Sequence, residues 1–293
     1  MWSQGYAPAN LRYCRFSTSS NADTMSSLHE RLPRLQGFIA RPPTPALAAH
    51  VQRFWWIEGD IAGAQDAQLL HPDGGSGVIF NFADPPIFDG STYRPRAIVA
   101  GPQLASARLQ LVGRVELMGV RFRPGMGAAF FGAGLDELEG FHGFDWPGSE
   151  LSGLVDQLAG LDWIAQQALV EEVLLRRLGG ALERRTPVQQ MLERIAASGG
   201  RARLSDMLET LPLGQRQLER LFRYQVGLTP KQYSRIQRVA LGRQVLRSDE
   251  TLLDTALACG YSDQAHFIHD FKGVVGMTPG QYRLRIKSSR SPG

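Results

Sequence analysis

The fold of the C-terminal third is decided by residues 251–283, which read TLLDTALACGYSDQAHFIHDFKGVVGMTPGQYR. Apolar residues recur there at helical spacing in two short runs, and this pattern predicts two helices. Gly260 lies between the runs and is expected to end the first helix, because glycine adopts the left-handed conformation at little cost. Ser262 or Asp263 follows, and a side-chain oxygen of either residue is expected to cap the second helix. The stretch is therefore a predicted helix-turn-helix, a motif whose second helix suits the DNA major groove.

Each of the two predicted helices has an apolar side and a polar side. In the first helix we expect one apolar face, made of Leu252, Leu253, Ala256 and Leu257. In the second helix, Phe267 and Phe271 lie four residues apart and are expected to point inward. The outer side of the second helix then carries Gln264, Ala265, His266 and His269.

A second copy of this stretch lies 49 residues upstream. At that offset residues 222–233 (FRYQVGLTPKQY) align with residues 271–282 (FKGVVGMTPGQY), and seven of the twelve positions are identical. The same offset pairs Gln215 with Gln264. Agreement of this extent at a fixed offset indicates a duplicated unit rather than chance. The sequence therefore predicts two tandem helix-turn-helices within residues 187–286.

Two tandem helix-turn-helices that each end in G-x-T-P-x-Q-Y resemble the DNA-binding domain of AraC/XylS-type bacterial transcription regulators. The resemblance covers residues 187–286. It implies double-stranded DNA and RNA polymerase as partners, a cytoplasmic protein associated with the bacterial nucleoid, and activation as the favoured mode of control. It also implies an N-terminal cupin-like barrel that binds a small-molecule effector or mediates formation of a homodimer. It implies no catalytic residue and no cofactor.

The outward side chains of the two recognition helices are the candidates for reading bases. In the first copy these side chains are Gln215, Arg216, Gln217 and Arg220. Arg pairs with guanine and Gln with adenine through two hydrogen bonds each, so these residue types suit base reading. The alternative is that Arg216 and Arg220 are solvated or contact phosphate. In the second copy the candidates are Gln264, Ala265, His266 and His269, and Asp270 is expected to face away from the DNA or to repel its phosphates. Candidates for contact with backbone phosphates are Lys272, Thr278 and Gln281.

A long helix is expected to hold the two copies apart. Pro230 suits its first turn, and the helix is predicted to reach about Arg247. Eighteen residues at ~1.5 Å each span about 27 Å. The two recognition helices would then lie close to one DNA turn apart, which is ~34 Å. Four arginines on this helix are either phosphate contacts or solvated residues: Arg235, Arg238, Arg243 and Arg247.

Positive charge is concentrated in the C-terminal third. From Thr186 onward the chain has 16 Lys/Arg and 9 Asp/Glu, a net charge of +7, whereas the remainder carries −3. A basic surface suits DNA phosphates, although solvated helix faces with surplus arginine give the same bias. Two cysteines, Cys14 and Cys259, are too few for a disulfide framework and fit a reducing compartment, and Cys259 is expected to be a small buried thiol. No stretch approaches the ~18 consecutive apolar residues of a membrane span.

The N-terminal half is predicted to be rich in strands. Residues 1–28 lack periodicity and are predicted to be a disordered tail without a secretory signal. Met25 is a candidate for the true start, because the ordered pattern begins only after it. Five short runs broken by Gly and Pro are predicted strands: 51–57, 77–82, 97–100, 107–112 and 115–122. Their near-regular spacing is typical of an antiparallel sandwich or a small barrel. A helical section is expected to begin at about residue 128.

Aromatic residues of these strands are candidates for lining an effector pocket: Trp55, Trp56, Phe80, Phe82 and Phe122. The alternative, that they only fill the core, is favoured, because adjacent residues of a strand point to opposite faces. Arg121 and Arg123 at a strand end are interpreted as solvated rather than as anion ligands. The histidines of this half are scattered and form no His-x-His pair, so no metal site is predicted. His71 is interpreted as a structural histidine.

Residues 150–180 are predicted to be helical, with an apolar stripe made of Leu151, Leu154, Leu158, Ile164, Ala168, Leu175 and Leu178. The stripe packs on the strands, forms a dimer seam, or does both. The predicted fold class is α+β: a β-rich cupin-like barrel or sandwich with flanking helices, followed by an all-α domain with two helix-turn-helices. The predicted boundaries are 1–28 and 287–293 for disordered tails, 29–180 for the effector or dimerisation domain, and 187–286 for the DNA-binding domain.

An enzyme that carries a DNA-binding domain of this type is the main alternative. A DNA-repair methyl acceptor needs a zinc-activated or low-pKa cysteine, and two cysteines cannot supply four thiolates. A cupin-type enzyme needs a histidine cluster, which the scattered histidines do not provide. Both enzymes are therefore disfavoured. The sequence predicts a sequence-specific DNA-binding transcription regulator without catalytic chemistry.

Overall fold

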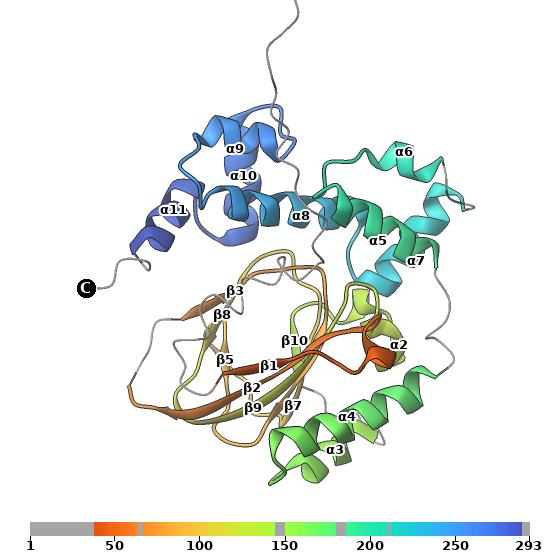
Figure 1. The fold of residues 1–293 in the computed structure, drawn as a ribbon, viewed down its shortest axis with the longest axis vertical. Coiled ribbons are helices and arrows are strands. Elements are labelled where there is room, and N and C mark those ends of the chain that lie inside the picture. The colour runs from red at the N-terminus through yellow and green to blue at the C-terminus, as the bar shows by residue number, and fades with distance from the viewer. Residues whose placement is uncertain are drawn as a thin grey trace, which may run out of the picture.

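A computed structural model describes residues 38–63, 67–143, 150–179, 186–209, 211 and 213–288 of the 293-residue chain. The chain has a strand-rich N-terminal part (residues 38–179) and a helical C-terminal part (residues 186–288), which lies across one end of the sheets (Figure 1). The predicted tail at 1–28, with Met25, lies outside the described residues, as does most of the predicted boundary between the two parts. No helix in the described ranges has the length and apolar character needed to cross a membrane.

Two antiparallel sheets form the N-terminal part. The larger sheet has the order β1-β2-β9-β4-β7-β10, and the smaller sheet has the order β3-β8-β5-β6. The five predicted strands are present as β2 (Val51–Ile61), β4 (Gly77–Asn81), β7 (Ala97–Ala100), β8 (Ala107–Gln110) and β9 (Gly113–Phe122). Five further strands are short and were not predicted: β1 (Ile39–Arg41), β3 (Gln68–Leu70), β5 (Ile87–Phe88), β6 (Ser91–Thr92) and β10 (Phe141–Gly143). Strands of two or three residues carry too little periodicity to be recognised.

The larger sheet is covered on both of its faces. The adjacent residues Trp55 and Trp56 point to opposite sides, because the side chains of a strand alternate. Trp56 lies in the apolar layer beneath the helices, and Trp55 lies in the layer between the two sheets. β4 is buried along its whole length, as a strand covered on both faces should be. Opposite Trp55 stands Gly119, where a Cβ atom would lie 2.0 Å from the indole, so only glycine leaves room for this ring.

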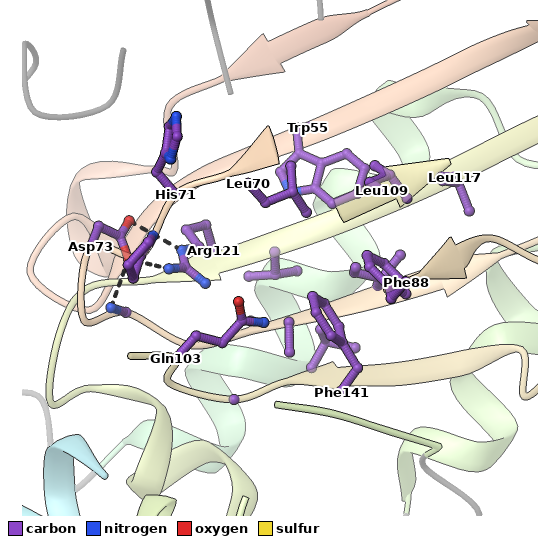
Figure 2. Close-up of a pocket in the computed structure, with 18 of the residues that line it drawn as sticks. Trp55, Leu70, His71, Asp73, Phe88, Gln103, Leu109, Leu117, Arg121 and Phe141 are labelled. Carbon is purple, nitrogen blue, oxygen red and sulfur yellow. Dashed lines mark hydrogen bonds and ion pairs between the residues drawn. The ribbon is translucent and has the colours of Figure 1, made fainter. Parts of the chain in front are cut away.

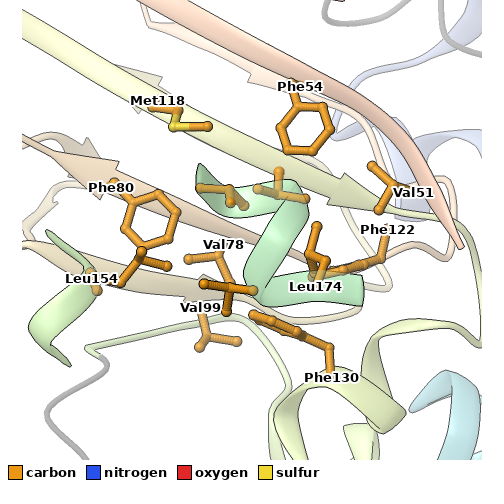
Figure 3. Close-up of a cluster of buried hydrophobic side chains, with 14 of the residues drawn as sticks. Val51, Phe54, Val78, Phe80, Val99, Met118, Phe122, Phe130, Leu154 and Leu174 are labelled. Atoms are coloured by element: carbon orange, nitrogen blue, oxygen red, sulfur yellow. The ribbon is translucent and has the colours of Figure 1, made fainter. Parts of the chain in front are cut away.

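The helices of the N-terminal part cover the Trp56 face. They are the short η3 (Pro45–Leu47), α2 (Gly127–Phe131) and η4 (Leu135–Glu137), and the longer α3 (Glu150–Leu158) and α4 (Trp163–Leu178). Figure 3 shows Phe54, Phe80 and Met118 of the strands facing the same apolar layer as Leu174 of α4. Trp56 Nε1 donates a hydrogen bond of 2.8 Å to Gln166 Oε1, which joins the sheet to α4 inside this layer.

The apolar stripe predicted over residues 150–180 is divided between the core and the surface. Leu154, Leu158 and Leu178 are buried in the core beneath the sheet, and the side chain of Leu151 lies outside the described residues. Ile164, Ala168 and Leu175 lie on the outer side, and Ile164 is 58% exposed. Intramolecular packing is therefore correct for the three buried residues, and the dimer seam stays a prediction for the three outward ones.

Seven helices make up the described C-terminal part: α5 (Pro187–Ala197), α6 (Leu204–Leu208), α7 (Gln215–Val226), α8 (Pro230–Val245), α9 (Leu252–Ala258), α10 (Gln264–Val275) and α11 (Pro279–Ser288). The duplication seen in the sequence is a duplication of structure. α7 and α10 start 49 residues apart, and each ends at a glycine in the left-handed conformation, Gly227 (φ 74°) and Gly276 (φ 82°). α11 continues to Ser288, so the tail predicted from residue 287 begins inside a helix.

Each copy has its own apolar core. Phe222 and Tyr233 are buried in the first core, and Phe271 and Tyr282, the residues at the same places in the repeat, are buried in the second core. The predicted apolar face of α9 is wrong in part: Ala256 is fully buried, but Leu253 and Leu257 are 48% and 54% exposed. Successive residues of a helix lie ~100° apart, so the pairs 252/253 and 256/257 cannot share one narrow face.

Each of the two helix-turn-helices contacts the N-terminal part. In the first copy, a Cβ atom at Gly227 would lie 2.2 Å from Pro102 and 2.6 Å from Leu135 O, so α7 ends directly against the N-terminal part. In the second copy, Ser106 donates from its backbone N and its Oγ to Val274 O, over 2.8 Å and 2.9 Å. The loop at 101–106 therefore contacts both helix-turn-helices.

A second loop, residues 71–76, contacts the helix that joins the two copies. Gln237 Nε2 of α8 donates to the backbone O of Asp73 over 3.3 Å. A Cβ atom at Gly74 would lie 2.5 Å from the ring of Tyr233, so this glycine lets the loop lie flat on α8. The His71 ring lies edge-on to Tyr282, with the ring centroids 6.1 Å apart. His71 Nδ1 also bonds Ser106 Oγ over 2.7 Å, which connects the two loops.

Candidate nucleic-acid interface

The first recognition helix, α7, presents its predicted base-reading residues to solvent. Leu218 and Phe222 are buried and fix α7 on its core. The opposite side is exposed at each of the four predicted positions: Gln215, Arg216, Gln217 and Arg220. Gln215 Nε2 donates to Glu219 Oε1 over 3.1 Å within the helix. Such a surface bond is easily exchanged for a bond to a base edge, because its net contribution to stability is small.

The second recognition helix, α10, has the same arrangement. Gln264, Ala265, His266 and His269 are exposed, and Phe267 and Phe271 are buried beneath them. Of the two predicted caps, Asp263 is the one used: its Oδ1 accepts from His266 N over 2.8 Å, and this bond lowers the pKa of the carboxyl group. The equivalent sides of both recognition helices are thus free to meet a ligand, as two-site reading of DNA requires.

Asp270 faces away from the exposed side of α10, which is the first of its two predicted placements. It is only 7% exposed, so it does not repel phosphate from the surface. Its Oδ1 lies 2.9 Å from Arg235 Nε, and its Oδ2 lies 3.7 Å from Arg238 Nη2 and 3.6 Å from His266 Nε2. Arg238 also lies over the Tyr261 ring, 4.6 Å from its centroid. Asp270 therefore fastens α10 to α8, and two arginines that the sequence offered to phosphate or solvent are used inside the protein.

The joining helix α8 is a structural spacer more than a phosphate-binding surface. It runs over 16 residues, from Pro230 to Val245, instead of the predicted eighteen, which gives about 24 Å at ~1.5 Å per residue. Arg243 is buried and donates from Nε to the Tyr282 hydroxyl over 3.2 Å. Of the four predicted arginines, Arg235, Arg238 and Arg243 are thus held by partners within the C-terminal part.

The phosphate candidate on α10, Lys272, is exposed. The two candidates at the start of α11 have a structural role. Thr278 N donates to Gln281 Oε1 over 3.0 Å, and Gln281 N donates to Thr278 Oγ1 over 3.3 Å, so these two residues form a reciprocal cap. The same T-P-x-Q cap starts α5 at Thr186 and α8 at Thr229. The motif that revealed the repeat is therefore a helix-starting device, and contact of Thr278 and Gln281 with phosphate stays a prediction.

A cavity lies between the two sheets, on the Trp55 face of the larger one. The space enclosed by its lining is about 860 Å³, open solvent at the mouth included. Figure 2 shows its apolar wall and its polar end. The wall includes Trp55, Leu70, Phe88, Leu109, Leu117 and Phe141. Of the five aromatic residues predicted to line a pocket, only Trp55 does so.

The other four predicted aromatics lie elsewhere, since Trp56, Phe80 and Phe122 are buried on the opposite face of the sheet and Phe82 packs against that same cluster. The alternating direction of strand residues explains the difference, because a strand gives only half of its aromatics to either face. Phe88 and Phe141 line the cavity but were not predicted to, because they lie on strands too short to be recognised from the sequence.

The polar end of the cavity is built around an ion pair. Arg121 of β9 pairs with Asp73 of the 71–76 loop, and Asp73 Oδ1 accepts from Gly75 N over 2.8 Å (Figure 2). Arg53 lies across from Arg121 in the strand register. Burial lowers the pKa of Arg53, Asp73 opposes this change, and the nearby Arg121 cation adds to it. The interpretation of Arg121 as a solvated edge residue is therefore wrong. Arg123, which was interpreted in the same way, donates a hydrogen bond of 2.7 Å to the backbone O of Ala48.

Cys259 is fully buried between α9 and α10, as the sequence analysis expected. Burial raises the pKa of its thiol to about 11, a change that the cations of Arg201 and Arg238 oppose. The thiolate is the reactive form of cysteine, so this residue suits a packing role rather than methyl transfer. Within the described ranges, no group of three His, Cys, Asp or Glu side chains is placed to hold a metal ion.

We expect iodoacetamide to modify Cys259 of the folded protein at pH 8 at least about a hundredfold more slowly than an ordinary cysteine of pKa ~8.5, because the thiolate is rare and enclosed. Peptide mass spectrometry of samples quenched over time measures this rate. The same protein in concentrated urea is the control, since there Cys259 should react at the ordinary rate. Equal rates in the two samples would contradict the assignment.

The comparisons with known proteins agree with this geometry. Residues 207–285 match a family model described as a helix-turn-helix domain, and residues 40–143 match one described as a domain of unknown function. The chain is 32% identical over 111 residues to the HTH-type transcriptional activator RhaR of Klebsiella pneumoniae, which covers 37% of this chain and 40% of that protein. It is 36% identical over 76 residues to the probable transcriptional regulator LumQ of Photobacterium leiognathi, which covers 26% of this chain and 31% of that protein.

The chain thus spans less than half of the length of these curated relatives. Among solved structures, it is similar to the DNA-binding domain of AdpA in complex with a target DNA, at 22% identity and a TM-score of 0.35, over 37% of this chain and 100% of that one. It is also similar to ToxT from Vibrio cholerae, at 9% identity and a TM-score of 0.41, over 79% of this chain and 97% of that one. With two copies of one helix-turn-helix unit, each closing in G-x-T-P-x-Q-Y, the C-terminal part of this chain is a DNA-binding domain of the AraC/XylS type.

Proposed function

We propose that the whole protein is a sequence-specific DNA-binding transcription regulator whose two recognition helices enter successive major grooves. The observation that carries the proposal is the pair of equivalent exposed faces on α7 and α10, held apart by α8. A spacer of about 24 Å plus the width of the packed helices suits the ~34 Å of one DNA turn. The net charge of +7 from Thr186 onward supports binding to phosphates.

The roles of the exposed residues follow from their chemistry. Arg216 and Arg220 suit guanine, and Gln215, Gln217 and Gln264 suit adenine. Ala265 suits contact with a thymine methyl group, and His266 and His269 suit hydrogen bonds to base edges. Lys272 is exposed and suits a phosphate, as do Thr278 and Gln281 at the start of α11.

Replacing Arg220 tests base reading. We expect Arg220→Ala to weaken binding to the preferred site by about 1–3 kcal/mol and to relax sequence preference, because one two-bond contact to a base is lost. Arg223→Ala is a matched control, since Arg223 is an exposed arginine on the same helix, nearer the end that packs on the N-terminal part. Sites selected from random DNA, followed by fluorescence anisotropy on selected and scrambled duplexes, measure both effects. An equal loss on both duplexes would assign Arg220 to a phosphate instead.

The finer parts of the proposal concern control. We propose that the N-terminal part, which contacts both helix-turn-helices, modulates DNA binding. We also propose that the bound protein activates transcription through RNA polymerase in the bacterial cytoplasm, at the nucleoid.

The outward residues Ile164, Ala168 and Leu175 of α4 support self-association. Sedimentation of the wild type and of Ile164→Glu tests this seam, because a charge on the seam should convert a dimer to a monomer. A dimer that persists in the variant would place the interface elsewhere.

A further inference from the structure

The cavity between the sheets has an apolar body and one charged end. Trp55, Phe88 and Phe141 belong to its wall, and Asp73 and Arg121 form an ion pair at its end (Figure 2). Arg53 lies beside Arg121 on the neighbouring strand, on the same face of the sheet. Asp73 is paired with Arg121, and Arg53 is near enough for the charges of both residues to act on it, so a surplus positive charge stays near this end of the cavity. A guanidinium group keeps its charge in proteins, so this surplus does not depend on pH in the neutral range.

We propose that this cavity binds a small apolar carboxylic acid, whose carboxylate replaces that of Asp73 on Arg121, and that the displaced 71–76 loop carries the signal to the DNA-binding part. The second half of this inference rests on the proposed function. The first half concerns the N-terminal part alone.

The charge of the site decides the class of ligand. An acid gains charge-assisted hydrogen bonds to a guanidinium group, which are about twice as strong as neutral ones. A neutral amide of the same shape must compete with the Asp73 carboxylate for Arg121 without a charge of its own. An amine would place a cation beside two cations, and only Asp73 would favour it. The apolar wall supplies the remaining affinity, because it removes an aryl or alkyl group from water.

The path to the DNA-binding part is short. Asp73 shapes its loop, since its carboxylate accepts from Gly75 N and pairs with Arg121. The backbone O of the same Asp73 accepts from Gln237 of α8. The next residue, Gly74, lies against Tyr233 of the first core, and burial, together with the Asp73 charge, raises the pKa of the Tyr233 hydroxyl. A change of partner for the Asp73 carboxylate therefore moves backbone that touches α8.

The second loop gives the cavity contact with both copies. Gly101 and Gln103 line the cavity, and Ser106, three residues farther on, bonds Val274 of α10. Pro102 lies against Gly227 at the end of α7. A ligand in the cavity thus meets the two loops that hold the two recognition helices, and it can change their relative placement without touching either one.

Titration calorimetry of the full-length protein with matched compounds tests the class of ligand. The acids are 3-phenylpropanoate and octanoate, and each is compared with its amide and with the amine of equal chain length. We expect each acid to bind at least about tenfold more tightly than its amide, the ratio for ~1.4 kcal/mol of charge-assisted bonding, and the amines to give no heat. Acids that bind no better than their amides, or that give no heat at about 1 mM, would overturn the proposal.

Three variants locate the bound molecule. Asp73→Asn should tighten acid binding by about tenfold, because it removes the competing charge; a cavity for cations would lose affinity instead. Arg121→Gln should abolish the preference for acid over amide, and Leu70→Trp should fill the partly exposed wall and weaken acid and amide alike. Thermal unfolding and circular dichroism monitor the folding of each variant. Asp73→Asn keeps the shape of the loop residue and decides the result should Arg121→Gln fail to fold.

Anisotropy with a selected DNA site tests the relay. A saturating acid should change the Kd for DNA at least about fivefold in the wild type, and DNA should change the Kd for the acid by the same factor, since coupling is reciprocal. Gln237→Ala should bring that factor towards one while the isolated protein still binds the acid. Acid binding without any change in DNA affinity would overturn the relay. Acid binding by a protein with no preferred DNA would contradict the proposed function and leave the ligand assignment standing.

Discussion

Gly227→Ala should detach the first helix-turn-helix from the N-terminal part. Gly227 ends α7 at φ 74°, a backbone conformation that costs a residue with a Cβ about 1–2 kcal/mol. The added Cβ would also lie 2.2 Å from Pro102 and 2.6 Å from Leu135 O, both in the N-terminal part. Overlap with backbone cannot be relieved by a rotamer change, so we expect about 1–3 kcal/mol beyond the conformational cost, or separation of the two surfaces.

The duplication provides the matched control. Gly276 ends α10 at φ 82°, at the same place of the second copy, and nothing lies within 4 Å of a Cβ added there. Gly276→Ala therefore bears the conformational cost alone. Small-angle scattering should detect a larger radius of gyration for Gly227→Ala but not for Gly276→Ala, and chemical denaturation should rank the two in the same order. Equal changes in both variants would mean that the contact between the two parts does not constrain Gly227.

Asp270→Asn should destabilise the second helix-turn-helix strongly. The carboxylate lies between Arg235 and Arg238 and is only 7% exposed. Removing one partner of a buried ion pair costs about 3–5 kcal/mol, because the other charge stays buried without compensation. Both arginine side chains are partly exposed, at 34% and 21%, so water screens part of this loss and we expect about 2–3 kcal/mol.

Asp249→Asn is the matched control for this second prediction. Asp249 pairs with Lys287 over 2.8 Å, but both side chains are exposed, and surface pairs add little. Urea denaturation should therefore leave the midpoint of Asp249→Asn near that of the wild type and lower that of Asp270→Asn. DNA binding should weaken along with stability in Asp270→Asn, because α10 is no longer fastened to α8. Equal midpoints for both variants would show that the buried cluster is not a support for α10.

The C-terminal part could be predicted closely because its sequence repeats. The offset of 49 residues related the two recognition helices to each other, and it placed the exposed faces around Arg216 and His266 on equivalent sides. The burial of Asp270 could not be foreseen, because its partners lie 35 and 32 residues away on α8 and no local pattern points to them. Leu253 and Leu257 are exposed because each lies ~100° around the helix from its buried or half-buried neighbour, and helical spacing alone does not separate such neighbours in a helix of seven residues.

The fold class of the strand-rich part could be predicted from the sequence, but the residues that line its cavity could not. Long strands such as β2 and β9 can be recognised from their sequence pattern. The residues that face the space between the sheets cannot, because they depend on how the two sheets pack together. Phe88, Phe141 and Asp73 lie far apart in sequence and meet only through the order of the strands. The pair of Asp73 with Arg121 joins a loop to a strand 48 residues farther on, and neither residue stands in a recognisable motif.

The two loops at 71–76 and 101–106 limit how the two parts of this protein can be recombined with parts of other proteins. A chimaera cut between residues 179 and 186 would join a foreign N-terminal part to helices shaped for these particular loops. Asp73 would lose its hydrogen bond to Gln237 and Ser106 its hydrogen bond to Val274, although the cut falls between the two parts in the sequence. A chimaera that keeps the contact between its two parts should therefore contain both loops together with the surfaces of α8 and α10 that they contact.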